Sequence, residues 1–168
     1  MRYLLANGPM QTTASFAAVT TGTSIKTMLQ AKPFIPMKIV EWGISFDGFA
    51  AALPGKVELI ETDVAATVTA SADVDITKLS QVGDGVAASV GGLTLGTTST
   101  GYTSSAEGTI TAIRNLDAPI FLPPTGPFVK QFPLGREPMI QVAKFGRIRV
   151  LFGTAVNCYC YMILESVG

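Results

Sequence analysis

Apolar and polar residues alternate along short stretches of this chain, and turn residues separate one stretch from the next. The clearest stretch is Lys38–Asp47, which ends at the turn pair Asp47-Gly48. A two-residue period is that of a half-buried β-strand, because successive side chains of a strand point to opposite faces of the sheet. The residues of this stretch that we expect in the core are Val40, Trp42, Ile44 and Phe46.

The same alternation recurs near the end of the chain. In Gly146–Phe152 it places Arg147 and Arg149 on the solvent side, and a further strand is expected at Val156–Glu165. About eight such stretches, spaced roughly 8–12 residues apart, are typical of an all-β fold, and we predict an antiparallel β-sandwich of the jelly-roll type. The second set of expected core residues is Ile148, Val150 and Phe152.

Two segments depart from the alternation. Residues 1–35 are rich in Thr and Ala, which we interpret as an extended N-terminal arm with edge strands, and residues 36–168 then form a single domain. Residues 83–108 are rich in Gly, Ser and Thr, with Tyr102 among few large side chains, and are expected to form one long loop. Such a loop is either an ordinary surface loop or one that lies over a neighbouring subunit.

The sequence contains no histidine and two cysteines. Histidine is the usual general base and a common metal ligand, so Ser-His-Asp relays, Cys-His relays and His-ligated metal sites are excluded. Cys158 and Cys160 share one side of a predicted strand about 6–7 Å apart, which is poor geometry for a disulfide. We expect them to be buried structural thiols. No cofactor, no bound metal and no catalytic residue is predicted, and we expect a protein that is not an enzyme.

Three aspartates near the Gly-rich segment, Asp73, Asp75 and Asp84, suggest calcium binding only weakly. They lack the ligand spacing and the bidentate glutamate of a known calcium loop.

Charge is scarce in this chain. Hydrophobic residues make up 48% and charged residues 14%, against about 25% charged residues in an average protein. The formal net charge is zero and the mean hydropathy is +0.40. We therefore expect much of the exterior to be buried against other copies of the chain or against another protein. The alternative is a monomer whose surface is rich in Ser, Thr and Gly. The absence of a basic arm argues against a nucleic-acid partner, and no apolar run resembles a signal peptide or a membrane span.

A charged pair, Arg136-Glu137, lies between prolines and glycine in Gln131–Pro138. It forms either a local salt bridge of little energetic value or a directional contact between subunits. The residues predicted to lie at an interface are Tyr102, Phe132, Arg136 and Glu137.

Two sequence blocks resemble small virion proteins of tailed bacteriophages, of the capsid decoration (cement) or minor structural type. One block joins Lys38–Gly48 to Val57–Leu59, and the other joins Phe132–Pro138 to Arg147–Val150 and Val156-Asn157. The resemblance implies a β-sandwich or jelly roll that assembles as a homotrimer on the head lattice. It also implies that the major capsid protein is the partner, and that the protein is made in the host cytoplasm and ends on the capsid surface of the virion.

Three other functions remain open. A receptor- or carbohydrate-binding jelly roll of a phage tail would use exposed aromatic residues. The other two are a major shell subunit of a small virus and an enzyme built on a β-barrel, for which the missing basic arm and the missing histidine are unfavourable. The aromatic candidates for the tail function are Tyr3, Phe49, Tyr102, Tyr159 and Tyr161.

Overall fold

The computed structural model describes residues 1–47, 53–79 and 85–167. This part of the chain is almost entirely β-structure, with one short 3-10 turn, η1 (Asp73–Asp75), and one short helix, α1 (Ala88–Gly91). Neither helix is long or apolar enough to span a membrane, and the described residues contain no other helix. The strands are β1 (Arg2–Ala6), β2 (Val19–Thr20), β3 (Lys26–Ala31), β4 (Met37–Asp47), β5 (Gly55–Thr62), β6 (Thr67–Ala70), β7 (Thr77–Lys78), β8 (Gly101–Ala106), β9 (Ile113–Leu122), β10 (Phe128–Gln131), β11 (Met139–Ile140), β12 (Phe145–Leu151) and β13 (Asn157–Ser166).

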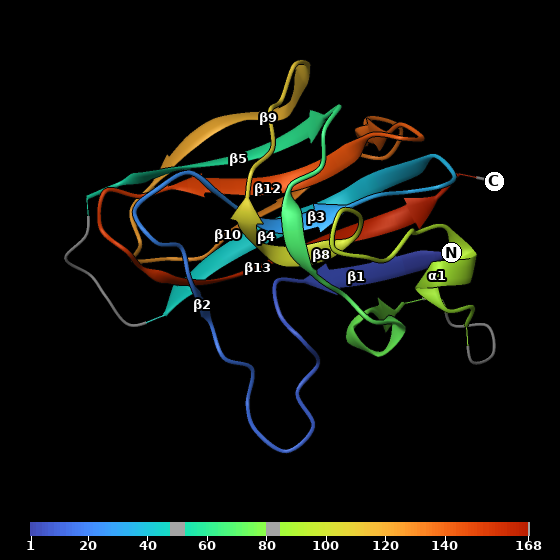
Figure 1. Ribbon diagram of the computed structural model, residues 1–168, viewed down its shortest axis with the longest axis horizontal. Coiled ribbons are helices and arrows are strands. Elements are labelled where there is room, and N and C mark those ends of the chain that lie inside the picture. Colours follow the sequence, from blue (N-terminus) through green and yellow to red (C-terminus); the bar gives the residue numbers. More distant parts are fainter. Residues whose placement is uncertain (48–52, 80–84, 168) are drawn as a thin grey trace.

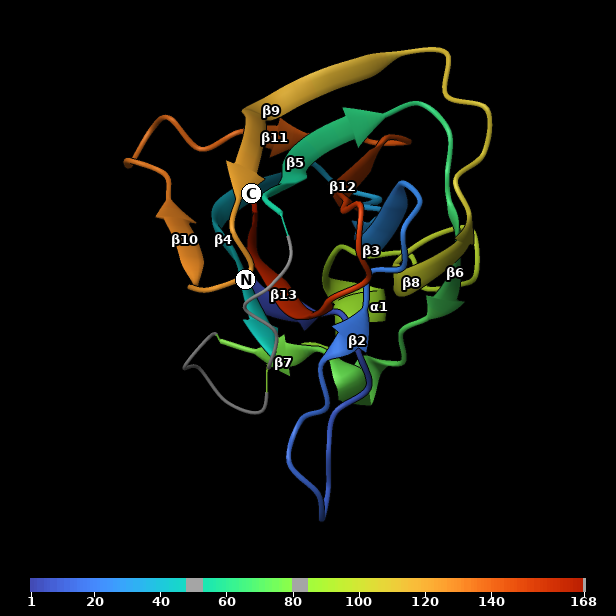
Figure 2. The same cartoon turned by 90° about the vertical axis from the view of Figure 1, so that its left-hand side faces the viewer.

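The strands form two sheets that pack face to face. The first sheet has the order β10-β4-β13-β1-β7, with β11 beside β4 and β2 beside β13, and the second has the order β6-β8-β3-β12-β5-β9. All of the neighbouring strands pair antiparallel. Figure 1 shows the strands of both sheets running along the long axis of the molecule, and Figure 2, which looks along them, shows how the two sheets curve around a common core. The predicted antiparallel β-sandwich is confirmed.

The pairing of the main strands is nested. The first strand, β1, pairs with the last, β13, and moving inward along the chain β3 pairs with β12, β4 with β10 and β5 with β9. This is the strand pairing of a jelly roll. The strands β10, β4, β13 and β1 lie in the first sheet, and β3, β12, β5 and β9 lie in the second. Both strands of each nested pair therefore belong to the same sheet.

The core lies between the two sheets. Trp42 and Ile44 of β4 are buried there, together with Ile148 and Val150 of β12 and with Phe152. Phe46 is half-buried, and its ring packs edge-on against the ring of Phe152, with a centroid separation of 5.4 Å. Burial of this apolar surface is the main driving force for packing the two sheets together.

Val40 does not belong to the core, and its prediction as a core residue is wrong. Along the β4–β13 pair, Glu41 lies opposite Ile163 but Ile39 lies opposite Leu164, so Val40 has no partner. This is a β-bulge, in which one extra residue reverses the alternation of the strand. Ile39 is consequently buried in the core, and Val40 is half-buried.

A long insertion, residues 63–112, separates β5 from β9. It adds β6 and β8 to one edge of the second sheet and β7 to one edge of the first, so it wraps around one side of the sandwich (Figure 1). The predicted loop over 83–108 is therefore not a single loop, because it contains α1 and β8. Strand β8 forms by pairing with β3 and β6, partners that are distant in sequence.

The insertion also covers the outer face of the second sheet where β3 pairs with β12. Gln30 and Arg147 lie opposite each other in the β3–β12 pair, and both are completely buried. The Gln30 side chain donates to the carbonyl oxygen of Ser99 at 2.6 Å and accepts from the backbone N–H of Ala66 at 2.8 Å. Arg147 Nη1 donates to the Glu107 carbonyl oxygen at 3.2 Å. The expectation that Arg147 points to solvent is wrong because the insertion lies over it.

The N-terminal segment 1–35 is not an extended arm. Strand β1 lies between β13 and β7, and β3 lies between β8 and β12, so both are interior strands of their sheets. The part that projects is the connection between β1 and β2, residues 8–18, which leaves the body of the molecule as a long loop (Figures 1 and 2).

Candidate interaction surface

The outer face of the first sheet is the sheet face that the insertion leaves accessible. We call it the open sheet face. Its members follow from the register, because residues opposite one another in paired strands point to the same side. They are all half-buried or exposed, and comprise Leu4, Ala6, Glu41, Ser45, Thr77, Val129, Gln131, Tyr159, Tyr161 and Ile163.

A row of aromatic rings crosses the open sheet face. Phe16, from the projecting loop, meets Tyr159 edge-on at a centroid distance of 4.7 Å. Tyr159 lies nearly parallel to Tyr161, with centroids 5.9 Å apart and an interplanar angle of 30°. Gly43, opposite Tyr161 on β4, makes room for this ring, because a Cβ atom there would lie 2.7 Å from Tyr161 Cε1. The row is therefore built into the sheet.

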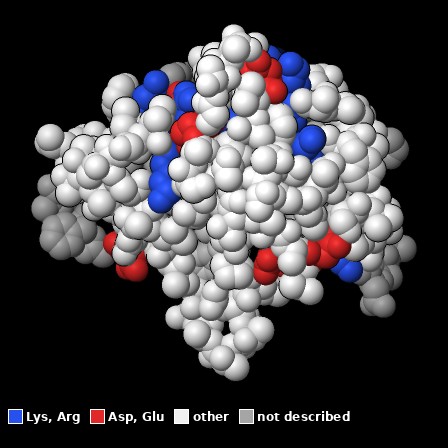
Figure 3. Space-filling model, in the orientation of Figure 1, with Lys and Arg blue, Asp and Glu red and all other residues white. Residues whose placement is uncertain are grey.

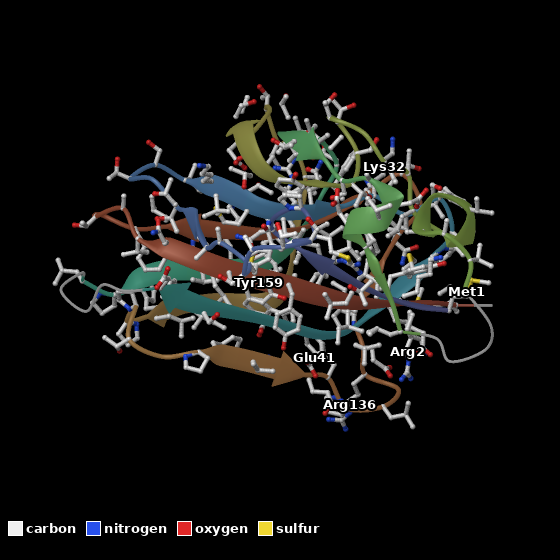
Figure 4. The ribbon with its side chains drawn as sticks, turned by 90° about the horizontal axis from the view of Figure 1, so that it is seen from below. Met1, Arg2, Lys32, Glu41, Arg136 and Tyr159 are labelled. Atoms are coloured by element: carbon white, nitrogen blue, oxygen red, sulfur yellow. The ribbon has the colours of Figure 1, made fainter. Side chains whose placement is uncertain are left out.

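Tyr161 is hydrogen-bonded to Glu41, the one carboxylate among the residues that define the open sheet face above. Its hydroxyl donates to Glu41 Oε1 at 2.6 Å, across two neighbouring strands. Burial and the negative charge of Glu41 both raise the pKa of Tyr161, so the hydroxyl stays protonated and remains a donor. Figure 4 looks at the sandwich from this side, with Tyr159 and Glu41 near the middle of the view.

Hydrogen bonds fix the base of the projecting loop. The Asp75 carboxylate accepts from the Met10 backbone N–H at 3.0 Å and from the Ala72 N–H at 2.9 Å. Asn7 extends the pairing of β1 with β13, since its side chain accepts from the Cys160 N–H at 2.9 Å and donates to the Cys158 carbonyl oxygen at 3.1 Å. The loop therefore leaves the sheet in a defined direction.

The aspartates considered for calcium have other roles. Asp75 holds the loop, and the Asp73 carboxylate accepts from the backbone N–H of Ser89 at 2.8 Å, at the start of α1. Asp84 lies outside the described residues. In the described ranges, no group of three acidic or cysteine side chains is placed to hold a metal ion.

Cys158 and Cys160 are free thiols on the inner side of β13, and both are completely buried. Burial raises the pKa of Cys158 to about 12, and it also raises the pKa of Cys160. A buried thiol with a raised pKa is a poor nucleophile and a poor metal ligand, so these side chains act as small apolar groups.

The predicted charged interface residues lie at the turn between β10 and β11. Arg136 is exposed at the edge of the sheet (Figure 4), and no carboxylate among the described residues pairs with it. Glu137 instead lies 3.9 Å from Lys38 Nζ and accepts from the Gly135 N–H at 2.8 Å. A local Arg136–Glu137 salt bridge is therefore not formed. Phe132 is half-buried against the core, with Lys130 Nζ 5.4 Å above its ring.

The other aromatic candidates are placed differently from Tyr159 and Tyr161. Tyr102, predicted at an interface, is half-buried and packs against the core on the inner side of β8. Tyr3 is completely buried, and its hydroxyl donates to the Val86 carbonyl oxygen at 3.0 Å. Phe49 lies outside the described residues. The structure thus brings two of the sequence candidates together on one surface.

No family model, curated protein or solved structure matches this chain. No comparison therefore supports the resemblance to phage decoration proteins, which is carried by two sequence blocks alone. Sequence reasoning missed Phe16 and the projecting loop as parts of the surface. The sequence did contain one indication of this surface, namely that residues 3–25 include no Lys, Arg, Asp or Glu.

Proposed function

We propose that this chain is a non-enzymatic virion protein that decorates an assembled capsid and stabilises it. In this proposal the chain binds the major capsid protein on the outer surface of the head as a symmetric oligomer, with a homotrimer as the expected form. The observation that carries the proposal is the uncharged loop 8–18, which projects from the β-sandwich (Figures 1 and 2).

The composition of the loop suits docking against another protein. Residues 11–17 are all exposed, although they include Phe16 and carry no charge. Figure 3 shows charged side chains in a few small groups, with an uncharged expanse between them that continues into the projecting loop. Docking an uncharged surface avoids the cost of removing charges from water.

A lattice makes a single short loop effective. One loop buries little surface by itself, so an isolated contact is expected to be weak. An oligomer that presents several loops to a symmetric lattice binds with avidity, because after the first contact the others become intramolecular. Each bound oligomer would then resist local separation of the capsid subunits that it joins.

The turn between β10 and β11 is the candidate contact between subunits. It exposes Leu134, at 93% of its surface, next to the exposed Arg136, which pairs with no carboxylate of the described residues. An apolar side chain beside a planar guanidinium group combines buried area with directional hydrogen bonding. We expect Arg136→Ala to leave the subunit folded and to weaken oligomer formation in analytical ultracentrifugation. An unchanged sedimentation coefficient for this variant would exclude Arg136 from the interface.

Binding to heads tests the proposal directly. Wild-type protein is mixed with purified heads that lack it and is sedimented with them. A variant in which residues 11–17 are replaced by Gly and Ser, without a change in length, should lose most of its occupancy. The matched control replaces the exposed turn residues 125–127 in the same way and should bind normally. The proposal fails if the wild-type protein does not sediment with heads, or if the loop variant binds as well as the control.

A receptor- or carbohydrate-binding module of a phage tail is the alternative function, and the aromatic row on the open sheet face favours it. Immunogold labelling of virions separates the two functions. Gold over the heads supports decoration, gold confined to the tail tip supports the alternative, and unlabelled particles contradict both.

A further inference from the structure

A groove lies beside the projecting loop, where the loop base, β1, β7 and β13 meet. Its volume is about 160 Å³, and it is open to solvent along the open sheet face. Pockets for drug-sized ligands are larger, at about 300–1,000 Å³, so this groove suits a single ring or a short side chain. The groove is lined by Leu4, Ala6, Gly8, Pro9, Met10, Gln11, Phe16, Asp75, Thr77 and Tyr159.

Two aromatic side chains form one wall of the groove. Tyr159 is half-buried with part of its ring accessible, and Phe16 meets it edge-on at 4.7 Å. Gly8 permits this arrangement, because a Cβ atom at that position would lie 3.1 Å from Phe16 Cζ. Tyr161 extends the aromatic surface beyond the groove toward Glu41. Phe16 and Tyr159 meet at an interplanar angle of 82° and so form an aromatic corner, in which a ligand ring can lie against the accessible part of Tyr159.

The walls are held in place before any ligand arrives. Asp75 fixes Met10 through the backbone N–H, and the paired strands fix Leu4 and Thr77 opposite each other. Asn7, immediately before the loop, is anchored to β13 because its side chain makes hydrogen bonds to two backbone groups of that strand. A preformed site loses less conformational entropy on binding than a mobile one, so even small contacts contribute to affinity.

The polar groups of the groove define the ligand further. Gln11 supplies an amide, Thr77 a hydroxyl and Asp75 a carboxylate, whereas the lining contains no Lys or Arg. A ligand that carries phosphate or carboxylate would meet the negative charge of Asp75 with no Lys or Arg in the lining to attract it. A ring with apolar C–H faces and hydroxyl groups around its edge satisfies both the aromatic wall and the polar rim.

From these features we propose that the groove binds one ring of a neutral sugar, with the C–H face of the ring against Tyr159. The open ends of the groove allow the ring to belong to a longer glycan. The groove shares Gln11 and Phe16 with the loop proposed to dock on capsids, but sugar binding does not require that docking and is tested whether or not the chain is found on phage heads.

Titration of the isotope-labelled protein with neutral oligosaccharides tests the site. The probes are maltotriose, cellotriose and N,N′,N″-triacetylchitotriose, and the readout is the change in amide resonances. At least one probe should shift the resonances of Met10, Gln11, Thr77 and Tyr159 while leaving the opposite sheet unchanged. Tyr159→Ala should weaken that binding by about tenfold or more.

The control variant is Val129→Ala, at the far edge of the same face, which should bind the sugar like the wild type. Amide spectra without ligand verify that both variants are folded. The proposal is overturned if none of the three sugars shifts the groove resonances at about 10 mM, a concentration that populates complexes with millimolar Kd. It is also overturned if Tyr159→Ala binds as tightly as Val129→Ala. Sedimentation of the same variants with heads reports separately on the proposed function.

Discussion

The indole N–H of Trp42 donates a 3.1 Å hydrogen bond to Asp117 Oδ2, and this bond joins the two sheets. Trp42 belongs to β4 in the first sheet, whereas Asp117 belongs to β9 at the edge of the second. The second carboxylate oxygen of Asp117 accepts from Lys130 Nζ on β10. Asp117 thus satisfies a buried indole and an ammonium group on the side of the sandwich that the insertion does not cover.

Truncation of Trp42 should be among the most destabilising changes in this chain. We expect Trp42→Ala to lower the free energy of unfolding by about 3–5 kcal/mol, because it leaves a cavity in the core. Trp42→Phe keeps most of the volume but removes the donor to Asp117, and should cost about 1–3 kcal/mol. Urea unfolding followed by circular dichroism measures both. A Trp42→Ala variant as stable as the wild type would contradict the placement of this side chain.

The bulge in β4 makes a separate prediction about two adjacent residues. Ile39→Ala should cost about 2–5 kcal/mol because Ile39 is fully buried, whereas Val40→Ala should cost about 1 kcal/mol or less. Urea unfolding of the two variants tests the register directly. Equal costs, or a larger cost for Val40, would show that the strand alternates without the extra residue.

This bulge shows where the sequence pattern stops being informative. The alternation correctly placed Trp42 and Ile44 in the core. Polar or small residues flank both of them in the sequence, so only one assignment of the two faces fits. At Ile39-Val40 two apolar residues are adjacent, so either one fits the buried side equally well. The choice depends on the pairing with β13, more than a hundred residues away, and no local pattern encodes it.

The same limitation explains the insertion and the surface. Composition predicted a loop over 83–108. Strand β8 nevertheless forms there, because it pairs with β3. Arg147 follows the polar alternation of β12, but Glu107 and its neighbours cover it. On the open sheet face, alternation placed Tyr159 and Tyr161 together correctly, whereas the contribution of Phe16 depends on how the loop folds back.

The contact between Glu107 and Arg147 should hold the insertion on the sandwich. Glu107 Oε2 lies 3.4 Å from Arg147 Nη1, and the same carboxylate accepts from the Thr27 backbone N–H at 2.6 Å. Burial lowers the pKa of Arg147 to about 10 and Glu107 opposes this shift, so Arg147 is charged at neutral pH. Glu107→Ala therefore leaves a buried charge unpaired and should cost about 3 kcal/mol.

The exposed pair Arg2–Glu165, with N and O atoms 3.1 Å apart, provides the matched control. Glu165→Ala should cost less than about 1 kcal/mol, since exposed ion pairs contribute little. Hydrogen exchange of β8 amides should accelerate in Glu107→Ala and remain unchanged in Glu165→Ala. Similar stabilities for the two variants would mean that the Glu107 contact does not hold the insertion.

Asp63 closes the base of the insertion and should make stability depend on acid pH. Its carboxylate accepts from the Thr111 hydroxyl and from the Ala112 N–H at 3.0 Å, and these bonds lower its pKa from 3.8 to about 2. A depressed pKa stabilises the fold above pH 3.8, and this contribution is lost as the pH falls through about 2.

Protonation of the Asp63 carboxylate can be followed in two ways. Carbon-13 chemical shifts should show Asp63 titrating near pH 2. The difference in unfolding free energy between the wild type and Asp63→Asn should shrink as the pH falls from 4 through 2, because Asp63 becomes protonated and neutral, as Asn is. Titration of Asp63 at an ordinary aspartate pKa, with a constant difference between the two proteins, would contradict this role.

The two thiols should be unreactive in the folded protein. Burial raises the pKa of Cys158 from 9.0 to about 12, which reduces its thiolate fraction at pH 8 by about a thousandfold. The pKa of Cys160 is raised as well, and both side chains are shielded from reagent. We expect a thiol-reactive dye to label neither cysteine of the native protein at pH 8, and to label both in urea, as measured by mass spectrometry.

Labelling of either thiol would report on opening of β13, because the reagent gains access only when this strand separates from its neighbours. Rapid modification of the native protein would show that the inner side of β13 is accessible to solvent, and would contradict the packing of the core described above.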